Sequence, residues 1–126
     1  MLTFGVVVLG VSDRQRAEAF WCAAMGYQVS DRPFGGWPRV LTPPPGRTGP
    51  VIALQTSRTD PQDHPRLHFD LHVNGVGEQE AEAARLMSLG ATRVSWDSYP
   101  DDPDFVVLAD PEGNRFCIVD LDHEGI

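Results

Sequence analysis

The segment Leu67-His68-Phe69-Asp70-Leu71-His72-Val73 alternates between apolar and polar side chains. Because successive side chains of a β-strand point to opposite faces, this alternation predicts a strand with one apolar and one polar face. The apolar set is expected to face helices. We therefore expect His68, Asp70 and His72 to share the open face of a sheet, with neighbours on that face roughly 7 Å apart.

The residues after this strand predict one helix and three further strands. Apolar residues at helical spacing indicate a helix over 76–89 that ends at Gly90, where a residue with positive φ is favoured. The residues expected on its buried face are Val76, Ala83, Leu86 and Met87. Strands are expected at 91–96, 105–109 and 116–121, with 110–114 forming the last turn.

The first half of the chain has the same order of predicted elements. A strand is expected at 3–9, followed by a helix that starts with a capping box of Ser12 and Gln15. The buried stripe of this helix consists of Ala17, Phe20, Trp21 and Ala24. Gly26 ends the helix, and strands follow at 27–31, 37–41 and 51–56.

The two halves therefore indicate an internal duplication. Gly26 and Gly90 lie 64 residues apart, and each precedes a Val-Ser pair by a few residues. We predict an α+β protein of two tandem βαβββ modules, over about 1–57 and 66–122, within a single domain of residues 1–126. The polar, proline-containing stretch 57–65 is interpreted as the linker.

Composition excludes several classes of partner. Hydrophobic residues make up 41% of the chain, as in an ordinary globular protein, and the net charge of −8 opposes binding to nucleic acid or to anionic membranes. The apolar stretch 4–11 is too short for a signal peptide and lacks a basic flank, so we expect a cytoplasmic protein. Cys22 and Cys117 are expected to be free thiols.

The strand 67–71 and the closing segment Asp110-Pro111-Glu112-Gly113-Asn114-Arg115-Phe116-Cys117, in this order of elements, resemble the vicinal oxygen chelate superfamily. This is the glyoxalase, bleomycin-resistance and extradiol-dioxygenase group, and the chain looks closest to small actinobacterial glyoxalase-like proteins. The resemblance implies two modules that form a curved mixed sheet around a central cup, with the helices packed outside and the functional site inside. It also implies a homodimer.

The resemblance further implies four metal-ligand positions, which fall on Val6, Ala53, His68 and Cys117. Val6 and Ala53 cannot bind a metal ion, and His68 with Cys117 provides fewer donors than a divalent site needs. We therefore expect no metal and no other cofactor. This departure puts lactoylglutathione lyase and dioxygenase activities in doubt, because both depend on a metal.

The remaining polar and aromatic residues of the implied cup are candidates for binding a small molecule. The candidate substrate-binding residues are His68, Asp70, His72, Gln55, Trp37 and Cys117. His68 and Asp70 are also candidate catalytic residues, because a carboxylate can orient a histidine for acid–base work. A catalytic role for Cys117 would need a nearby base, so it is interpreted first as a small buried hydrophobe. Phe34, Trp96 and Tyr99 are interpreted as an aromatic border or as ordinary packing.

Two classes of function remain open. One is a metal-free protein that binds a small organic molecule, for which the acidic surface would suit a cationic ligand. The other is an enzyme, either a lyase, isomerase or dioxygenase-like protein using His68 and Asp70 as acid and base, or a metal enzyme with an unusual ligand set of His68, Asp70 and His72.

Overall fold

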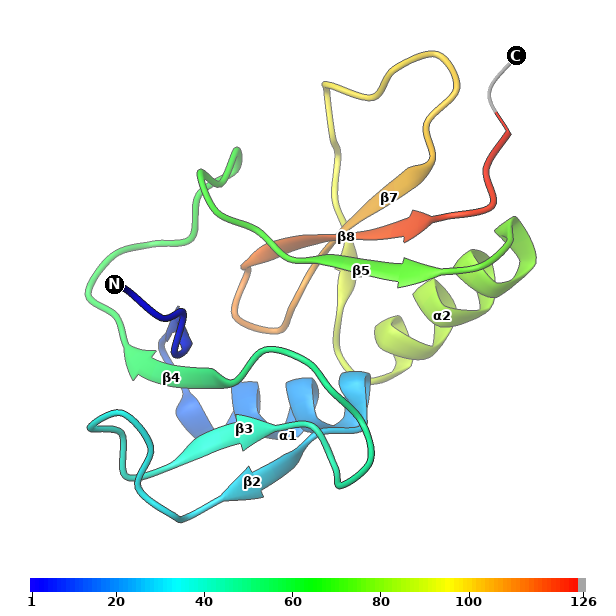
Figure 1. The fold of residues 1–126 in the computed structure, drawn as a ribbon. Coiled ribbons are helices and arrows are strands. Elements are labelled where there is room, and N and C mark those ends of the chain that lie inside the picture. Colours follow the sequence, from blue (N-terminus) through cyan, green and yellow to red (C-terminus); the bar gives the residue numbers. More distant parts are fainter. Residues whose placement is uncertain (125–126) are drawn as a thin grey trace. The chain divides into compact units, whose positions relative to one another are not determined.

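The computed structural model describes residues 1–124, which fold as two units, one of residues 1–60 and one that begins at Pro61. Each unit runs strand, helix and three strands along the chain. Figure 1 shows the helix and most of the strands of each unit. The order along the chain is therefore βαβββ twice. The prediction of an α+β protein built from two tandem modules is confirmed.

The first unit contains a four-stranded mixed sheet and one helix. Its strands are β1 (Val7–Val11), β2 (Gln28–Ser30), β3 (Val40–Thr42) and β4 (Ile52–Thr56). The order in the sheet is β1-β4-β3-β2, with β1 parallel to β4 and the other pairs antiparallel. The helix α1 (Arg14–Met25) provides the connection between β1 and β2.

Helix α1 starts one residue later than the capping-box pattern predicted. The N-cap is Asp13, whose carboxylate accepts a hydrogen bond from the backbone N–H of Arg16 at 3.1 Å. Ser12 lies outside the helix, and an aspartate is at least as good an N-cap as a serine. Gly26 ends the helix with φ of 65°, as expected. Of the predicted stripe, Ala17, Phe20 and Trp21 are buried and Ala24 is half-buried.

The second unit repeats this topology with its own sheet. Its strands are β5 (Asp70–Val73), β6 (Thr92–Arg93), β7 (Phe105–Ala109) and β8 (Arg115–Asp120). The sheet order is β5-β8-β7-β6, with β5 parallel to β8 and the other pairs antiparallel. The helix α2 (Val76–Ser88) buries Ala83 and Leu86, whereas Val76 is exposed, which corrects its predicted place on the buried face.

Several strand boundaries differ from those predicted from the sequence. β1 begins at Val7 rather than Thr3, β3 begins at Val40 rather than Trp37, and β6 is only two residues long. A strand extends only as far as a partner ladder exists, and β6 pairs with just two residues of β7. Within residues 1–124, neither helix has the length and apolar character needed to cross a lipid bilayer.

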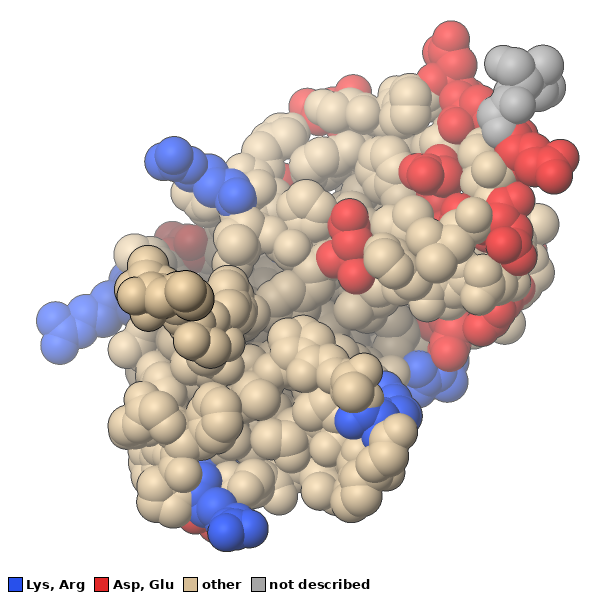
Figure 2. Space-filling model, in the orientation of Figure 1, with Lys and Arg blue, Asp and Glu red and all other residues tan. Residues whose placement is uncertain are grey.

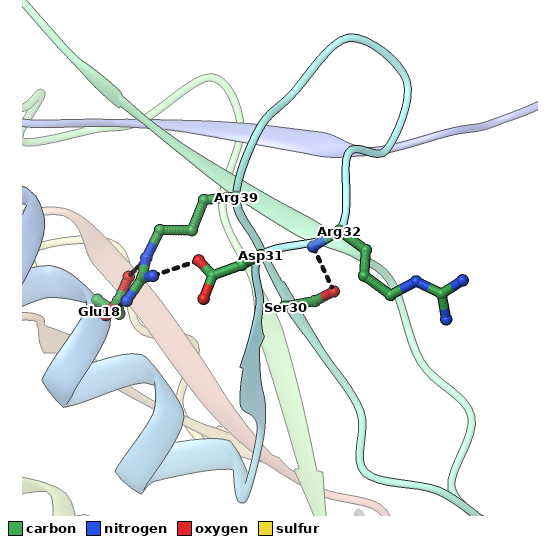
Figure 3. Close-up of polar contacts among 5 residues, drawn as sticks. All are labelled: Glu18, Ser30, Asp31, Arg32 and Arg39. Carbon is green, nitrogen blue, oxygen red and sulfur yellow. Dashed lines mark hydrogen bonds and ion pairs between the residues drawn. The ribbon is translucent and has the colours of Figure 1, made fainter.

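An arginine joins the helix and the β2–β3 hairpin of the first unit (Figure 3). The Arg39 guanidinium donates to both carboxylate oxygens of Glu18 on α1, at 2.8 and 2.7 Å, and also to Asp31, which follows β2. This bidentate geometry is the stronger form of ion pair. The hydrogen bond from Arg39 lowers the pKa of Glu18 below its usual range.

We predict that Glu18→Gln lowers the free energy of unfolding at neutral pH by about 1 kcal/mol. Because the folded-state pKa of Glu18 is depressed, its contribution is full above the ordinary glutamate pKa and is lost as pH falls through the lowered value. The difference between the variant and the wild type should therefore shrink in acid. Urea unfolding at several pH values measures it.

Glu82→Gln is the matched control, because Glu82 pairs with Arg85 within one exposed helix face. This pair should contribute less than Glu18 with Arg39. Two results would contradict a stabilising ion pair between Glu18 and Arg39. One is an equal loss of unfolding free energy in both variants, and the other is a loss in Glu18→Gln that stays constant from neutral to acid pH.

Candidate functional site

Strand pairing in the second unit decides which side chains share the open face of its sheet. Cys117 on β8 pairs with Asp70 on β5 and with Val107 on β7. Paired residues of neighbouring strands lie on the same face, so these three form one row across the sheet. Phe116 and Ile118 flank Cys117 in the sequence and lie on the opposite face, where both are buried.

His68, Asp70 and Cys117 form a compact polar cluster on this open face. The Nε2 atom of His68 lies 3.0 Å from Oδ1 of Asp70. One potential ligand atom from each of the three residues lies within 4.8 Å of the other two. The side chains of His68 and Asp70 are 44% and 51% exposed, whereas Cys117 is buried. A solvent-accessible ion pair therefore stands beside a buried thiol.

The surroundings of Cys117 keep its sulfur protonated. Burial raises the pKa of the thiol to about 11, and the carboxylate of Asp70 adds to the rise through its negative charge and a hydrogen bond with the thiol. A thiol must be deprotonated to act as a nucleophile or as a metal ligand. At neutral pH Cys117 is thus a neutral hydrogen-bond donor. The interpretation of Cys117 as a small buried hydrophobe describes its burial but not its contact with Asp70.

His72 lies on the same face of β5 as Asp70 and is exposed, but it is not part of the cluster. Its cross-strand partner is Val119. The metal-ligand set predicted as an alternative was His68, Asp70 and His72. The structure groups Cys117, and not His72, with His68 and Asp70. The contact of Cys117 with Asp70 was not predicted because the two residues are far apart in the sequence.

The apolar side of the predicted strand is less regular than the polar side. Val73 is buried and Leu71 is half-buried, but Phe69 is only half-buried and Leu67 is 69% exposed. The expectation that Leu67 faces the helices is therefore wrong. Leu67 precedes the residues that pair with β8, so the sheet does not fix its direction.

Gln55 and Trp37 belong to the first unit and are described with it. Gln55 is exposed on β4, opposite Gly10 of β1, and shares the face of Ala53 as predicted. Trp37 is half-buried in an isolated bridge with Phe34. Neither residue is a member of the His68, Asp70 and Cys117 cluster.

The first unit carries the same strand pairing with different chemistry. Val8 pairs with Ala53 between the parallel strands β1 and β4, as Asp70 pairs with Cys117 between β5 and β8. Val6, two residues before Val8, takes the place that His68 has before Asp70. This row of the first unit offers no metal ligand, acid or base.

A second polar group surrounds Trp96 and was not predicted from the sequence. The His64 ring lies 4.9 Å from the Trp96 ring between centroids, and the Arg115 guanidinium lies 5.9 Å from the Trp96 ring centroid. His64 Nε2 is also 2.9 Å from Asp97 Oδ1. These contacts attach the linker to the second module. No sequence pattern links residues so far apart along the chain.

Comparison with known proteins identifies the family of this chain. Residues 6–119 match the family described as the glyoxalase-like domain. The chain therefore belongs to the glyoxalase-like domain family, within the vicinal oxygen chelate superfamily. No curated protein matches it.

Solved structures share the fold at low sequence identity. A glyoxalase/bleomycin resistance protein/dioxygenase family enzyme from Burkholderia phytofirmans is 19% identical, with a TM-score of 0.69 over 95% of this chain and 99% of that one. A glyoxalase-related enzyme from Fulvimarina pelagi is 18% identical, with a TM-score of 0.65 over 94% and 88%. The fosfomycin resistance protein FosX from Listeria monocytogenes, complexed with Mn(II) and dihydroxypropylphosphonic acid, is 14% identical, with a TM-score of 0.67 over 94% and 90%. At these identities the likeness shows the fold alone.

We predict that Asp70→Asn makes Cys117 more reactive toward iodoacetamide. Removing the carboxylate removes two of the causes that raise the thiol pKa, so the thiolate fraction at pH 8 rises and alkylation should accelerate several-fold. Peptide mass spectrometry would follow the two cysteines separately. Cys22 is the internal control, because its raised pKa depends on burial and on Glu18. Equal rates at Cys117 in both proteins would show that Asp70 does not control this thiol.

Proposed function

We propose that this glyoxalase-like protein binds a small organic molecule on the open face of the second module's sheet, without a resident metal ion. The observation that carries the proposal is the accessible pair of His68 and Asp70 beside the buried Cys117. This pair offers one group that donates when protonated and one that accepts. A small number of fixed polar groups on an apolar surface is the usual composition of a ligand site.

Apolar neighbours on the same face support binding of an organic molecule. Val107 completes the row of Asp70 and Cys117 but is buried, whereas the half-buried Val119 and Phe105 form the next row with His72. Aliphatic and aromatic side chains of this kind contribute contact area. The polar pair would then fix the orientation of a ligand.

The charge distribution favours a cationic ligand. Residues 61–126 contain fourteen acidic residues and four arginines, whereas residues 1–60 contain four acidic residues and six arginines. Figure 2 shows acidic side chains gathered around α2 and the end of β8. Such an excess of negative charge raises the local concentration of cations and speeds their association.

A metal centre is the second candidate, and the cluster geometry favours it. Imidazole nitrogen, carboxylate oxygen and thiolate sulfur are all zinc ligands, and three protein donors with one open position are typical of a catalytic zinc site. His68, Asp70 and Cys117 would hold the ion, which would act as a Lewis acid on a bound substrate. Against this stand the protonated thiol and the absence of any donor in the equivalent row of Val6, Val8 and Ala53.

We predict that zinc chloride titrated into the purified, chelator-treated protein binds weaker than micromolar, because a metal must displace the thiol proton and break the pair of His68 and Asp70. Isothermal titration calorimetry measures this. Tight binding of one ion per chain that is lost in both His68→Ala and Cys117→Ser would overturn the metal-free proposal and establish the second candidate.

We predict that His68→Ala removes binding of small organic cations while leaving the melting temperature nearly unchanged, because this exposed side chain contributes little packing. NMR spectra of isotope-labelled protein, recorded with a library of small amines and guanidines, should show shifts at the amides of residues 68–72 and 117. Phe116→Ala is the stability control, since its buried ring should cost about 3–5 kcal/mol when truncated. Binding that persists in folded His68→Ala, or shifts confined to other residues, would place the site elsewhere.

A further inference from the structure

The second unit has a hollow beside Phe105 and Val106, where β7 has no pairing with β6. Its volume is about 360 Å³. The lining residues are Gln79, Glu80, Ala83, Arg93, Tyr99, Pro103, Phe105 and Val106. Arg93 pairs with Leu108 and Val106 pairs with Ile118, which places both on the face covered by α2. Phe105 lies on the other face, in the row of Val119 and His72, so the hollow is at the edge of the sheet. His68, Asp70 and Cys117 do not line it.

We propose that this hollow is a second binding site and that it takes a small zwitterion, a molecule with one carboxylate and one ammonium group on a flat apolar body. A volume of about 360 Å³ is at the lower end of the range of small-molecule sites, about 300–1,000 Å³. The size suits a ligand of a single ring with a short charged chain. Three features of the lining define its chemistry.

The first feature is an arginine with no partner of its own. Arg93 lies on the short edge strand β6, and within residues 1–124 no carboxylate forms an ion pair with it. By contrast, Arg39, Arg85 and Arg115 each pair with an acidic residue. A guanidinium presents parallel N–H donors that match a carboxylate, so Arg93 is suited to bind the anionic end of a ligand.

The second feature is a pair of acceptors on α2. The Nε2 atom of Gln79 donates to the backbone carbonyls of Asp104 and Ile118, both at 3.0 Å, which leaves its Oε1 as an acceptor. Glu80, the next residue, is exposed and has no ion pair in the described part of the chain. An amide oxygen and a carboxylate at one rim suit an ammonium group.

The third feature is an aromatic wall that is held in place. The rings of Tyr99 and Phe105 lie 5.2 Å apart between centroids, with 33° between their planes. The Tyr99 hydroxyl accepts a hydrogen bond from the backbone N–H of Val107 at 2.8 Å, so its own proton remains available for a ligand. A positioned aromatic pair contributes apolar contact area for a flat group.

The opposite charges of the lining explain the choice of a zwitterion. Glu80 and Arg93 line the same hollow but form no ion pair with each other in the described structure. A ligand with a single charge would satisfy one of them and meet the other as a like charge or not at all. A ligand with both charges, separated by a short chain, can satisfy each in turn.

The test uses L-phenylalanine as the zwitterionic probe and two analogues that each lack one charge. Hydrocinnamate lacks the ammonium group, and phenethylamine lacks the carboxylate. Calorimetric titration of the full chain should show saturable binding of L-phenylalanine at one site per chain, with each analogue about tenfold weaker or more. In Arg93→Gln, the preference for L-phenylalanine over phenethylamine should disappear. In Glu80→Gln, the preference over hydrocinnamate should disappear.

Two variants serve as controls. Arg85→Gln removes an exposed arginine of α2 that does not line the hollow, and His68→Ala removes a histidine that also does not line it. Arg85→Gln should bind L-phenylalanine like the wild type. His68→Ala should lose any binding of phenethylamine on the open face but keep the binding of L-phenylalanine, and melting temperatures would confirm that all four variants are folded. The proposal is overturned if L-phenylalanine does not saturate, if Arg93→Gln retains the wild-type preference, or if His68→Ala abolishes binding. The last result would assign the probe to the open face instead.

Discussion

The parallel pairing of β5 with β8 is the constraint on which the candidate site depends. This register sets Asp70 beside Cys117, and the backbone N–H of Cys117 donates to the carbonyl of Phe69 at 2.9 Å, which extends the ladder toward His68. A slip of one residue would turn every side chain of the strand to the other face. The burial of Phe116 and Ile118 opposes such a slip, because both would then lose their place in the core.

The same strand pairing occurs in both modules, but only the second module has polar, ionisable side chains at the paired positions. In the first module, the row of Val8 and Ala53 has no donor or acceptor side chain, and Gln55 is the nearest polar residue along β4. The pairing of parallel first and last strands is therefore a property of the fold. Function depends on which side chains occupy the paired positions, as expected for folds that host several chemistries.

Much of the fold could be predicted from the sequence, because each helix and most strands have a clear local signal. The end of α1 at Gly26 and the span of β7 agree with the prediction. Strand ends were less accurate, since the length of β6 depends on its partner rather than on its own residues. The N-cap of α1 is Asp13 rather than the predicted Ser12. The sequence did not distinguish the two neighbours, because aspartate and serine are both good N-cap residues.

The candidate site was predicted only in part. Alternation along residues 67–73 correctly placed His68 and Asp70 together among exposed residues, because that signal is local. The contact of Asp70 with Cys117, the contact of the His64 and Trp96 rings and the hollow beside Arg93 all join residues distant in sequence. Such contacts follow from strand register and helix packing, which a single sequence does not specify residue by residue.

The register of β5 against β8 is the central claim, and NMR distance contacts test it most directly. Nuclear Overhauser spectra of the wild-type protein should connect the ring protons of His68 with the β-protons of Cys117. They should show no contact between that ring and Phe116 or Ile118. Contacts from the His68 ring to Phe116 or Ile118 in place of Cys117 would contradict the register, and with it the arrangement of the candidate site.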